Sequence, residues 1–311
     1  MGLIADINVR DAKGQTVLHR ASNPQFVQAL LAKGADINAQ NAAGHTALML
    51  RTHVDETARL LIERGADVSI RDARGLTVLH KVVSENLIPL AKLVIERKAD
   101  VNAVDANGKT ALHLLRSREM AELLVSAGAN VSVKGTDGRT ALHGAAVRGE
   151  AEVSRVLIEK GADPLARAVD GATPIHDATR DARGGVLKEL LAVKSQGVNA
   201  IDNNGRSPLH HASEQRYDAV LKELIEKGAR LDLADRFGNT PLHQATLVGN
   251  AYTTGFLVKA GADPKVRNKD GKTSFDLAMQ STKSEELLKA LRGEVDAART
   301  ARESLRDRSR P

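Results

Sequence analysis

Histidine is the residue type in this 311-residue sequence best suited to acid–base or metal chemistry near neutral pH. Ten histidines are present, and seven of them end copies of one motif of the form D-x-x-G-x-T-x-L-H: His19, His80, His113, His143, His176, His210 and His243. A catalytic or metal site brings unlike residues together at one point. One identical residue in each copy predicts a ladder of histidines instead.

Aspartate recurs in a second motif, of which Gly34-Ala-Asp-Ile-Asn38 and Lys98-Ala-Asp-Val-Asn102 are two copies. These aspartates suggest calcium, but they lack the 12-residue ligand spacing of a calcium loop. Turn and cap chemistry explains them better. No H-E-x-x-H, nucleotide-binding glycine loop or G-x-S-x-G occurs, and there is no cysteine. The sequence therefore favours a protein that is not an enzyme and needs neither cofactor nor metal.

Composition limits the kind of fold that can position these motifs. Hydrophobic residues make up 42% of the chain, but only four Phe, two Tyr and no Trp are present. So few aromatics cannot anchor large globular interiors. No run of about 18 apolar residues exists, so we expect no membrane span. Lys+Arg 45 against Asp+Glu 39 gives a net charge of +6, a weak basic bias that disfavours nucleic acid as the partner.

The motif repeats along almost the whole chain. Its Thr or Ser lies at positions 16, 46, 77, 110, 140, 173, 207, 240 and 273, at spacings of 30 to 34 residues. Thr240-Pro-Leu-His-Gln-Ala245 reads T-P-L-H-x-A, and the period is near 33. The sequence thus resembles the ankyrin-repeat family. The resemblance implies an all-α solenoid of about nine helix-turn-helix units with projecting β-hairpin tips.

Local signals support the same units. The motif Thr or Ser is a good helix N-cap, and the closing Gly suits a left-handed C-cap. Lys98 stands where six other repeats have Gly, so we expect mild backbone strain there. Repeats one, two and four are two or three residues short, which predicts trimming of the first helix or of the inter-helix loop.

Three segments follow from the repeat pattern. Residues 1–10 read as the tail of a truncated preceding repeat, residues 11–292 as the ankyrin-repeat domain, and residues 293–311 as an Arg-rich C-terminal helix or tail. Leu288, Leu291, Val295 and Ala298 are spaced so that they could extend the last helix as a cap.

The resemblance also implies the function, which is non-catalytic binding of a folded protein along a concave face. In this family the motif histidine is structural and bonds to the motif threonine and to the neighbouring hairpin. The binding positions are the hairpin tips and the exposed face of each first helix. The matching residues that we predict to contact a partner are Lys13, Arg74, Leu76, Lys109, Arg139, Arg206, Arg236, Phe237, Asn239, Lys269 and Lys272.

Eight of the tip residues are Lys or Arg, which predicts a partner protein with an acidic surface. Binding of nucleic acid or another anionic polymer along these tips is the competing hypothesis. Phe237 either contacts the partner or packs against a neighbouring hairpin, and the sequence leaves both open.

The absence of cysteine is compatible with an oxidising compartment, and the chain starts in mid-repeat at Met1-Gly2. The sequence is similar to bacterial periplasmic ankyrin proteins of the immunity or inhibitor type. That similarity implies a periplasmic shield that blocks a peptidoglycan peptidase. A cytoplasmic scaffold and a secreted effector adaptor are the alternatives.

Overall fold

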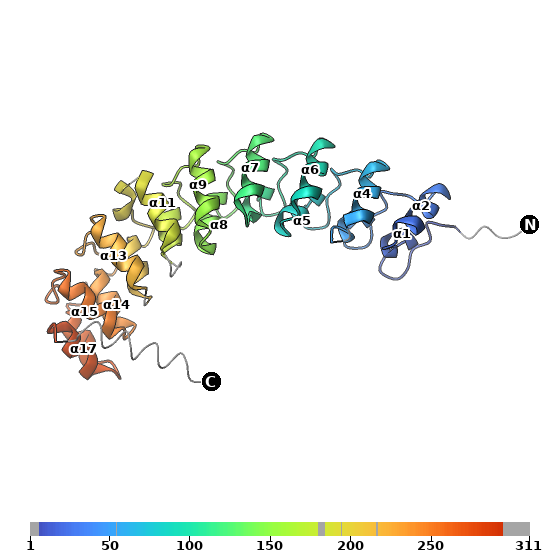
Figure 1. Cartoon of the computed structure of the whole chain (residues 1–311). Coiled ribbons are helices and arrows are strands. Elements are labelled where there is room, and N and C mark those ends of the chain that lie inside the picture. The colour runs from blue at the N-terminus through green and yellow to red at the C-terminus, as the bar shows by residue number, and fades with distance from the viewer. Residues whose placement is uncertain (1–5, 54, 180–183, 194, 216, 295–311) are drawn as a thin grey trace, which may run out of the picture. The chain divides into compact units, whose positions relative to one another are not determined.

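The computed structural model describes residues 6–53, 55–179, 184–193, 195–215 and 217–294. Within these ranges the secondary structure is helical and no strand is assigned, which confirms the predicted all-α class. Helices pair in chain order, and each pair forms one repeat (Figure 1). The pairs are α1 Val17–Arg20 with α2 Pro24–Ala32, α3 Ala47–Leu50 with α4 Asp55–Glu63, α5 Val78–Ser84 with α6 Ile88–Glu96, η1 Ala111–Leu114 with α7 Arg118–Ser126, α8 Ala141–Arg148 with α9 Ala151–Glu159, α10 Pro174–Ala178 with α11 Gly185–Val193, α12 Pro208–Ser213 with α13 Asp218–Glu226, α14 Pro241–Leu247 with α15 Ala251–Lys259, and α16 Ser274–Met279 with α17 Ser284–Leu291. A 3-10 turn, η2 Ser195–Asn199, follows α11.

The chain divides into two compact units. The N-terminal unit comprises residues 1–141 with 159–162, and the C-terminal unit comprises residues 142–158 with 163–311. Within each unit, neighbouring repeats pack side by side through Leu, Val, Ile and Ala. These side chains are small enough for helices to stack closely without aromatic residues.

Helix starts follow the predicted capping. Thr46 has extended backbone angles, and its hydroxyl accepts a hydrogen bond from the Met49 N–H at 3.3 Å. The shortened repeats lose residues from the first helix, since α1, α3 and η1 have four residues each whereas α5 and α14 have seven. The predicted trimming is therefore confirmed, and it lies in the first helix.

The closing position of the repeats adopts the left-handed backbone that the sequence predicts, except in the sixth repeat, where Gly197 lies in η2 without a positive φ. Gly34 has φ 88° and Gly128 has φ 91°. Lys98 adopts the same region with φ 63°, as expected for a residue in the place of Gly. A Cβ atom disfavours this conformation, so Lys98 carries local strain.

Tight turns connect one repeat to the next and form the tips. In the eighth repeat, the Asp235 carboxylate accepts the Phe237 and Asn239 N–H groups, both at 2.8 Å. The Asp235 N–H donates to the Asn239 carbonyl at 2.9 Å and closes the hairpin. Gly238 has φ 77°, and a Cβ there would lie 2.7 Å from the Lys269 nitrogen of the next tip. Close stacking of the tips therefore requires glycine.

The two ends of the chain are described only in part. Asn8 donates from Nδ2 to the Gly34 carbonyl at 3.2 Å and accepts the Asp36 N–H at 2.8 Å. Asn102 makes the same two contacts with the following repeat, which is how the tail of a repeat behaves. At the other end α17 stops at Leu291, and the predicted Arg-rich extension over residues 295–311 lies outside the described residues. No described helix combines the length and the apolar character that crossing a membrane requires.

Candidate protein-binding surface

The motif histidines form the predicted structural ladder. In the first repeat, the Thr16 N–H donates to Nδ1 of His19 at 3.0 Å, and Nε2 of His19 lies 3.0 Å from the His45 carbonyl oxygen of the next tip. Since Nδ1 accepts a backbone N–H, the proton is on Nε2, which donates to the carbonyl. The same pair of contacts, from Nδ1 within the repeat and from Nε2 to the next repeat, occurs at His80, His113, His176, His210 and His243.

Burial keeps these histidines neutral. It lowers the pKa of His176 to about 4 and that of His210 to about 4. At His19, His80, His113 and His243, burial again lowers the pKa. A neutral imidazole is the form that both hydrogen bonds need, so burial and hydrogen bonding favour the same state.

The closing aspartate and asparagine motif is also structural. Its Asp caps a turn, as when Asp100 accepts the Asn102 N–H at 2.9 Å. Its Asn links repeats, since Asn102 Oδ1 accepts the Asn130 N–H at 2.7 Å. In the described part of the chain, no three His, Cys, Asp or Glu side chains cluster as metal ligands.

The predicted contact residues lie on the tips of both units. Lys13, Arg74, Leu76, Lys109 and Arg139 belong to the N-terminal unit, and Arg206, Arg236, Phe237, Asn239, Lys269 and Lys272 belong to the C-terminal unit. Lys13, Arg74, Arg236, Phe237 and Lys269 are exposed. Leu76, Lys109, Arg139, Arg206 and Lys272 are half-buried.

Asn239 does not fit its predicted role. Only 8% of the residue is exposed, and its Oδ1 accepts a hydrogen bond from Asn268 Nδ2 at 2.8 Å. Its carbonyl also accepts Nε2 of His210. The prediction that Asn239 contacts a partner is therefore wrong, because the side chain is used to join the eighth and ninth repeats.

Several tip charges are neutralised within the protein. Arg206 Nη2 lies 2.6 Å from Glu214 Oε1, and Lys109 Nζ lies 3.1 Å from Asp137 Oδ2. Arg206 and Lys109 are therefore ion-paired with acids of the same chain, and their contact with a partner stays a prediction. The remaining basic character is concentrated on fewer tips than the sequence predicts.

The C-terminal unit contains a polar network that the sequence did not predict. Glu214 Oε1 accepts a hydrogen bond from Arg206 Nη2 and another from Gln244 Nε2 at 2.9 Å. Glu214 therefore connects the seventh and eighth repeats. His211 is half-buried, and its Nε2 lies 3.1 Å from Asp202 Oδ2. The signal available in the sequence was an acid seven residues after the motif Ser207, where other repeats lack one.

Phe237 is exposed on its tip. The residue is 54% exposed, and the Arg236 guanidinium carbon lies 4.6 Å from the ring centroid. At this distance the guanidinium makes a cation–π contact with the ring. The Lys269 N–H donates to the Phe237 carbonyl at 3.0 Å, and Lys269 Nζ donates to the Arg236 carbonyl at 2.7 Å. Arg236, Phe237 and Lys269 thus form one exposed cluster, which we call the aromatic tip.

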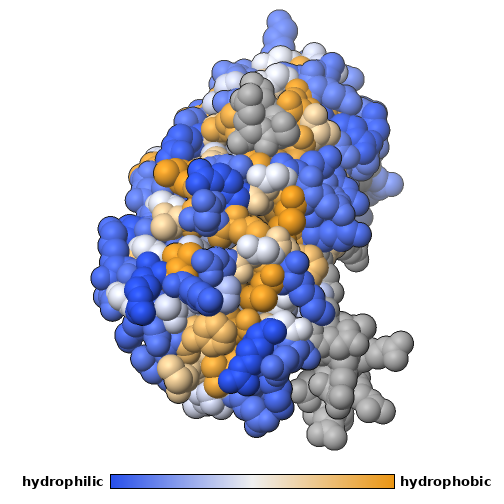
Figure 2. Space-filling model, turned by 90° about the vertical axis from the view of Figure 1, so that its left-hand side faces the viewer, coloured by the Kyte–Doolittle hydropathy of each residue, from blue (hydrophilic) through white to orange (hydrophobic). Residues whose placement is uncertain are grey.

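Surface hydropathy is mixed. Figure 2 shows hydrophobic residues as a broken band between hydrophilic ones on the face that it presents. Exposed aliphatic residues in the C-terminal unit include Leu247, Val248 and Met279. Scattered apolar residues of this kind are ordinary on protein surfaces, so the candidate contact is defined by the aromatic tip.

Stacked helix pairs joined by hydrogen-bonded tips define a helical repeat protein. The family model described as ankyrin repeats in three copies matches residues 2–72, 50–135, 79–168, 115–196 and 164–235, and the single ankyrin repeat matches residues 237–269. The chain therefore belongs to the ankyrin-repeat family. Domains of this family are typically non-catalytic modules for protein–protein interaction.

Relatives match over short stretches. The chain is 33% identical over 95 residues to ankyrin repeat and SAM domain-containing protein 6 of mouse, covering 30% of this chain and 11% of that protein. It is 39% identical over 59 residues to the nematode (Caenorhabditis elegans) homolog of ankyrin repeat and LEM domain-containing protein 1, covering 19% of this chain and 8% of that protein. It is 44% identical over 55 residues to human ankyrin repeat domain-containing protein 29, covering 18% of this chain and 17% of that protein. The chain spans less than a fifth of each of these relatives.

Solved structures match over a larger part of the chain. The ankyrin repeat domain of Bcl-3, a member of the IkappaB protein family, has a TM-score of 0.59 and 28% identity, covering 70% of this chain and 99% of that one. The ankyrin repeat domain of human ASB11 has a TM-score of 0.59 and 29% identity, covering 68% of this chain and 96% of that one. These similarities support the fold and the general role in binding.

Proposed function

We propose that this chain binds a folded partner protein without catalysis, and that the aromatic tip of the C-terminal unit anchors the contact. The observation that carries this proposal is the exposed Phe237 ring beneath the Arg236 guanidinium. Exposed aromatics beside arginine are enriched among the residues that dominate binding energy. In a chain with six Phe and Tyr residues in total, few aromatics can serve this role.

The aromatic tip is ordered before any partner arrives. Asp235 fixes the turn through two backbone N–H groups, and the tip is bonded to both neighbours, by the Arg236 N–H to the Asn204 carbonyl at 2.8 Å and by Lys269. Little conformational freedom is then lost on binding, and this favours affinity.

The partner surface that complements this tip is acidic. Arg236 and Lys269 are exposed and lie on adjacent tips. Positive charges at the rim of a contact accelerate association with a negatively charged partner. Salt screens this attraction, so the association rate falls as the salt concentration rises.

Affinity capture with matched variants tests the proposal. The double variant Arg236→Ala/Phe237→Ala should lose at least about tenfold in captured partner relative to wild type. The control is Phe26→Ala, which removes another exposed aromatic, in the first repeat. Far-UV circular dichroism should give the same melting temperature for wild type and for the double variant. Undiminished capture by the double variant, or an equal loss in the control, would refute the anchoring role.

A narrower form of the proposal concerns the partner and the compartment. We propose a periplasmic location, with a peptidoglycan peptidase as the shielded partner, on the basis of the family resemblance and the absence of cysteine. Fractionation of the native cells, followed by detection of the full-length protein, tests the location. Recovery in the cytoplasm alone would refute it and favour a cytoplasmic scaffold. Peptidase activity that does not change on addition of the purified chain would refute inhibition.

A further inference from the structure

The first repeat exposes apolar residues at positions that other repeats bury. Val17 directly follows the motif Thr and is 45% exposed, whereas the residue at this position is buried in all eight other repeats. Phe26 is the third residue of α2 and is 49% exposed, whereas the third residue of the second helix is at most 2% exposed in repeats two to eight. The difference comes from position in the array, since residue types at these sites vary.

Contacts elsewhere show what normally covers these positions. Thr57 corresponds to Phe26, and its hydroxyl donates to the Ser22 carbonyl in the preceding repeat at 2.7 Å. Thr253 corresponds to Phe26 in the eighth repeat and donates to the Gln215 carbonyl of the preceding repeat at 3.1 Å. The position therefore lies against the inter-helix loop of the repeat before it.

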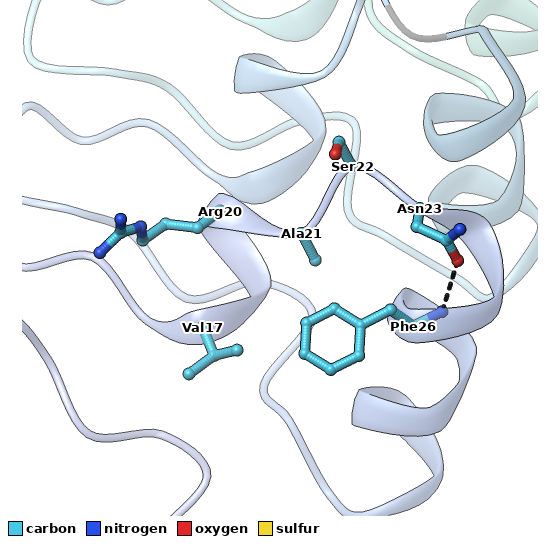
Figure 3. A pocket seen from close by; sticks show the side chains of 6 residues that line it. All are labelled: Val17, Arg20, Ala21, Ser22, Asn23 and Phe26. Atoms are coloured by element: carbon cyan, nitrogen blue, oxygen red, sulfur yellow. Dashed lines mark hydrogen bonds between the residues drawn. The ribbon is translucent and has the colours of Figure 1, made fainter.

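Val17, Ala21 and Phe26 form a shallow pocket of about 360 Å³ together with Arg20, Ser22 and Asn23. In Figure 3 the side chains of Val17 and Ala21 point toward the Phe26 ring, and the Arg20 side chain extends away from it. The Asn23 side chain caps α2 through the Phe26 N–H at 3.0 Å. We call the surface of Val17, Ala21 and Phe26 the leading face.

The last repeat exposes the opposite half of the same contact. Met279, six residues after its motif Thr, is 63% exposed, whereas this position is at most 1% exposed in repeats five to eight. Phe275, two residues after the Thr, is half-buried where the first eight repeats bury Leu or Ile. The position of Met279 faces the following repeat, since Thr52 occupies it in the second repeat and donates to Glu85 of the third at 2.8 Å. We call the surface of Phe275 and Met279 the trailing face.

We propose that two copies of this chain associate head to tail, with the leading face of one copy on the trailing face of the next. The two faces are complementary because they are the two halves of the contact that joins consecutive repeats within the chain. Phe26 would lie against the loop between α16 and α17 of the second copy, as Thr57 lies against Ser22. This contact forms between two molecules and requires no particular arrangement of the two units within one chain. It uses residues other than those of the aromatic tip, so it is separate from partner binding there.

A head-to-tail contact uses two different patches, so each added copy leaves one face of each kind uncovered. Assembly then continues with concentration instead of stopping at a symmetric dimer. Sedimentation velocity of the full chain over a range of concentrations should therefore show an average mass that rises past twice the monomer mass. Wild type that stays monomeric at every concentration would overturn the proposal.

Two charge substitutions separate head-to-tail assembly from other arrangements. Phe26→Lys places a charge on the leading face, and Met279→Lys places one on the trailing face. Both residues are exposed, so both variants should fold, and circular dichroism can verify this. Each variant alone should be monomeric. An equimolar mixture should form a heterodimer, because each variant keeps the face that the other lacks. A mixture that stays monomeric would overturn the head-to-tail arrangement.

The matched control is Val169→Lys, which introduces the same charge at another exposed apolar residue, on a tip. This variant should self-associate as wild type does. Loss of association in the control would assign the effect to general surface charge and overturn the assignment to the leading and trailing faces.

Discussion

Acidification should destabilise this protein through its buried histidines. Protonation of His210 would place a proton on Nδ1, where the Ser207 N–H already donates at 3.0 Å. Two donors would then face each other at the start of α12, and the helix cap would be lost. The link from Nε2 to the Asn239 carbonyl at 2.9 Å depends on the same ring orientation. Acid therefore affects both the helix start and the joint between two repeats.

The magnitude follows from the lowered pKa values. Burial lowers the pKa of His176 and of His210 to about 4, and the usual value is 6.5. Since the unfolded chain binds more protons between pH 4 and 6.5, the stabilisation is complete above pH 6.5 and falls as the pH drops toward 4. Relative to neutral pH, the free energy of unfolding at about pH 5 is lower by about 2 kcal/mol for each of these histidines. The two together lower it by about 4 kcal/mol.

Urea denaturation followed by circular dichroism between about pH 7.5 and about pH 5 measures this loss, in a range where most carboxyls stay ionised. His210→Gln removes one titrating group, so it should lose about 2 kcal/mol less than wild type over the same range. Stability that does not change with pH, or an equal loss in wild type and variant, would refute the reasoning.

Four further substitutions and one binding assay test other parts of the structure. Lys98→Gly should raise the free energy of unfolding in urea by about 1 kcal/mol, because it relieves a left-handed residue with φ 63°; a decrease would contradict the strain. Gly44→Ala should destabilise more than Gly34→Ala, since a Cβ at Gly44 would lie 2.7 Å from the Ala73 nitrogen and nothing lies within 4 Å at Gly34; equal losses in urea denaturation would contradict this. Asp235→Ala should cost about 2 kcal/mol, because two N–H groups of the hairpin lose their acceptor, and an unchanged urea midpoint would count against that role. A gel-shift assay at low salt should show no retardation of duplex DNA, since ion pairs neutralise part of the basic tips; strong, salt-sensitive retardation would favour the anionic-polymer hypothesis.

Much of the fold could be predicted from local sequence because each repeat contains its own signals. Thr16 and its counterparts cap helices, Gly34 and its counterparts end them, and the missing residues of repeats one, two and four shorten the first helix. The structural role of the motif histidine was predictable from the family resemblance, and its partners are the expected ones. These features depend on residues within one repeat or at a fixed offset in the next.

The character of individual surface residues could not be predicted in the same way. The motif places Asn239 and Arg206 on tips. In the structure, however, Asn239 is buried and hydrogen-bonded to Asn268, and Arg206 forms an ion pair with Glu214. Such contacts depend on the side chains that happen to lie on the adjacent repeat and on the first helix. The motif does not constrain those side chains.

The sequence by itself determined the repeat class, the number of repeats and the capping residues that begin and close each unit, because these depend on short-range capping, turn geometry and a regular period. Only the tertiary structure decided which tip charges remain available, that Phe237 stacks with Arg236, and that Phe26 and Met279 are exposed at opposite ends of the repeat array. Exposure of Val17 at the first repeat is a property of stacking, because the same motif position is buried in all eight repeats that follow another repeat.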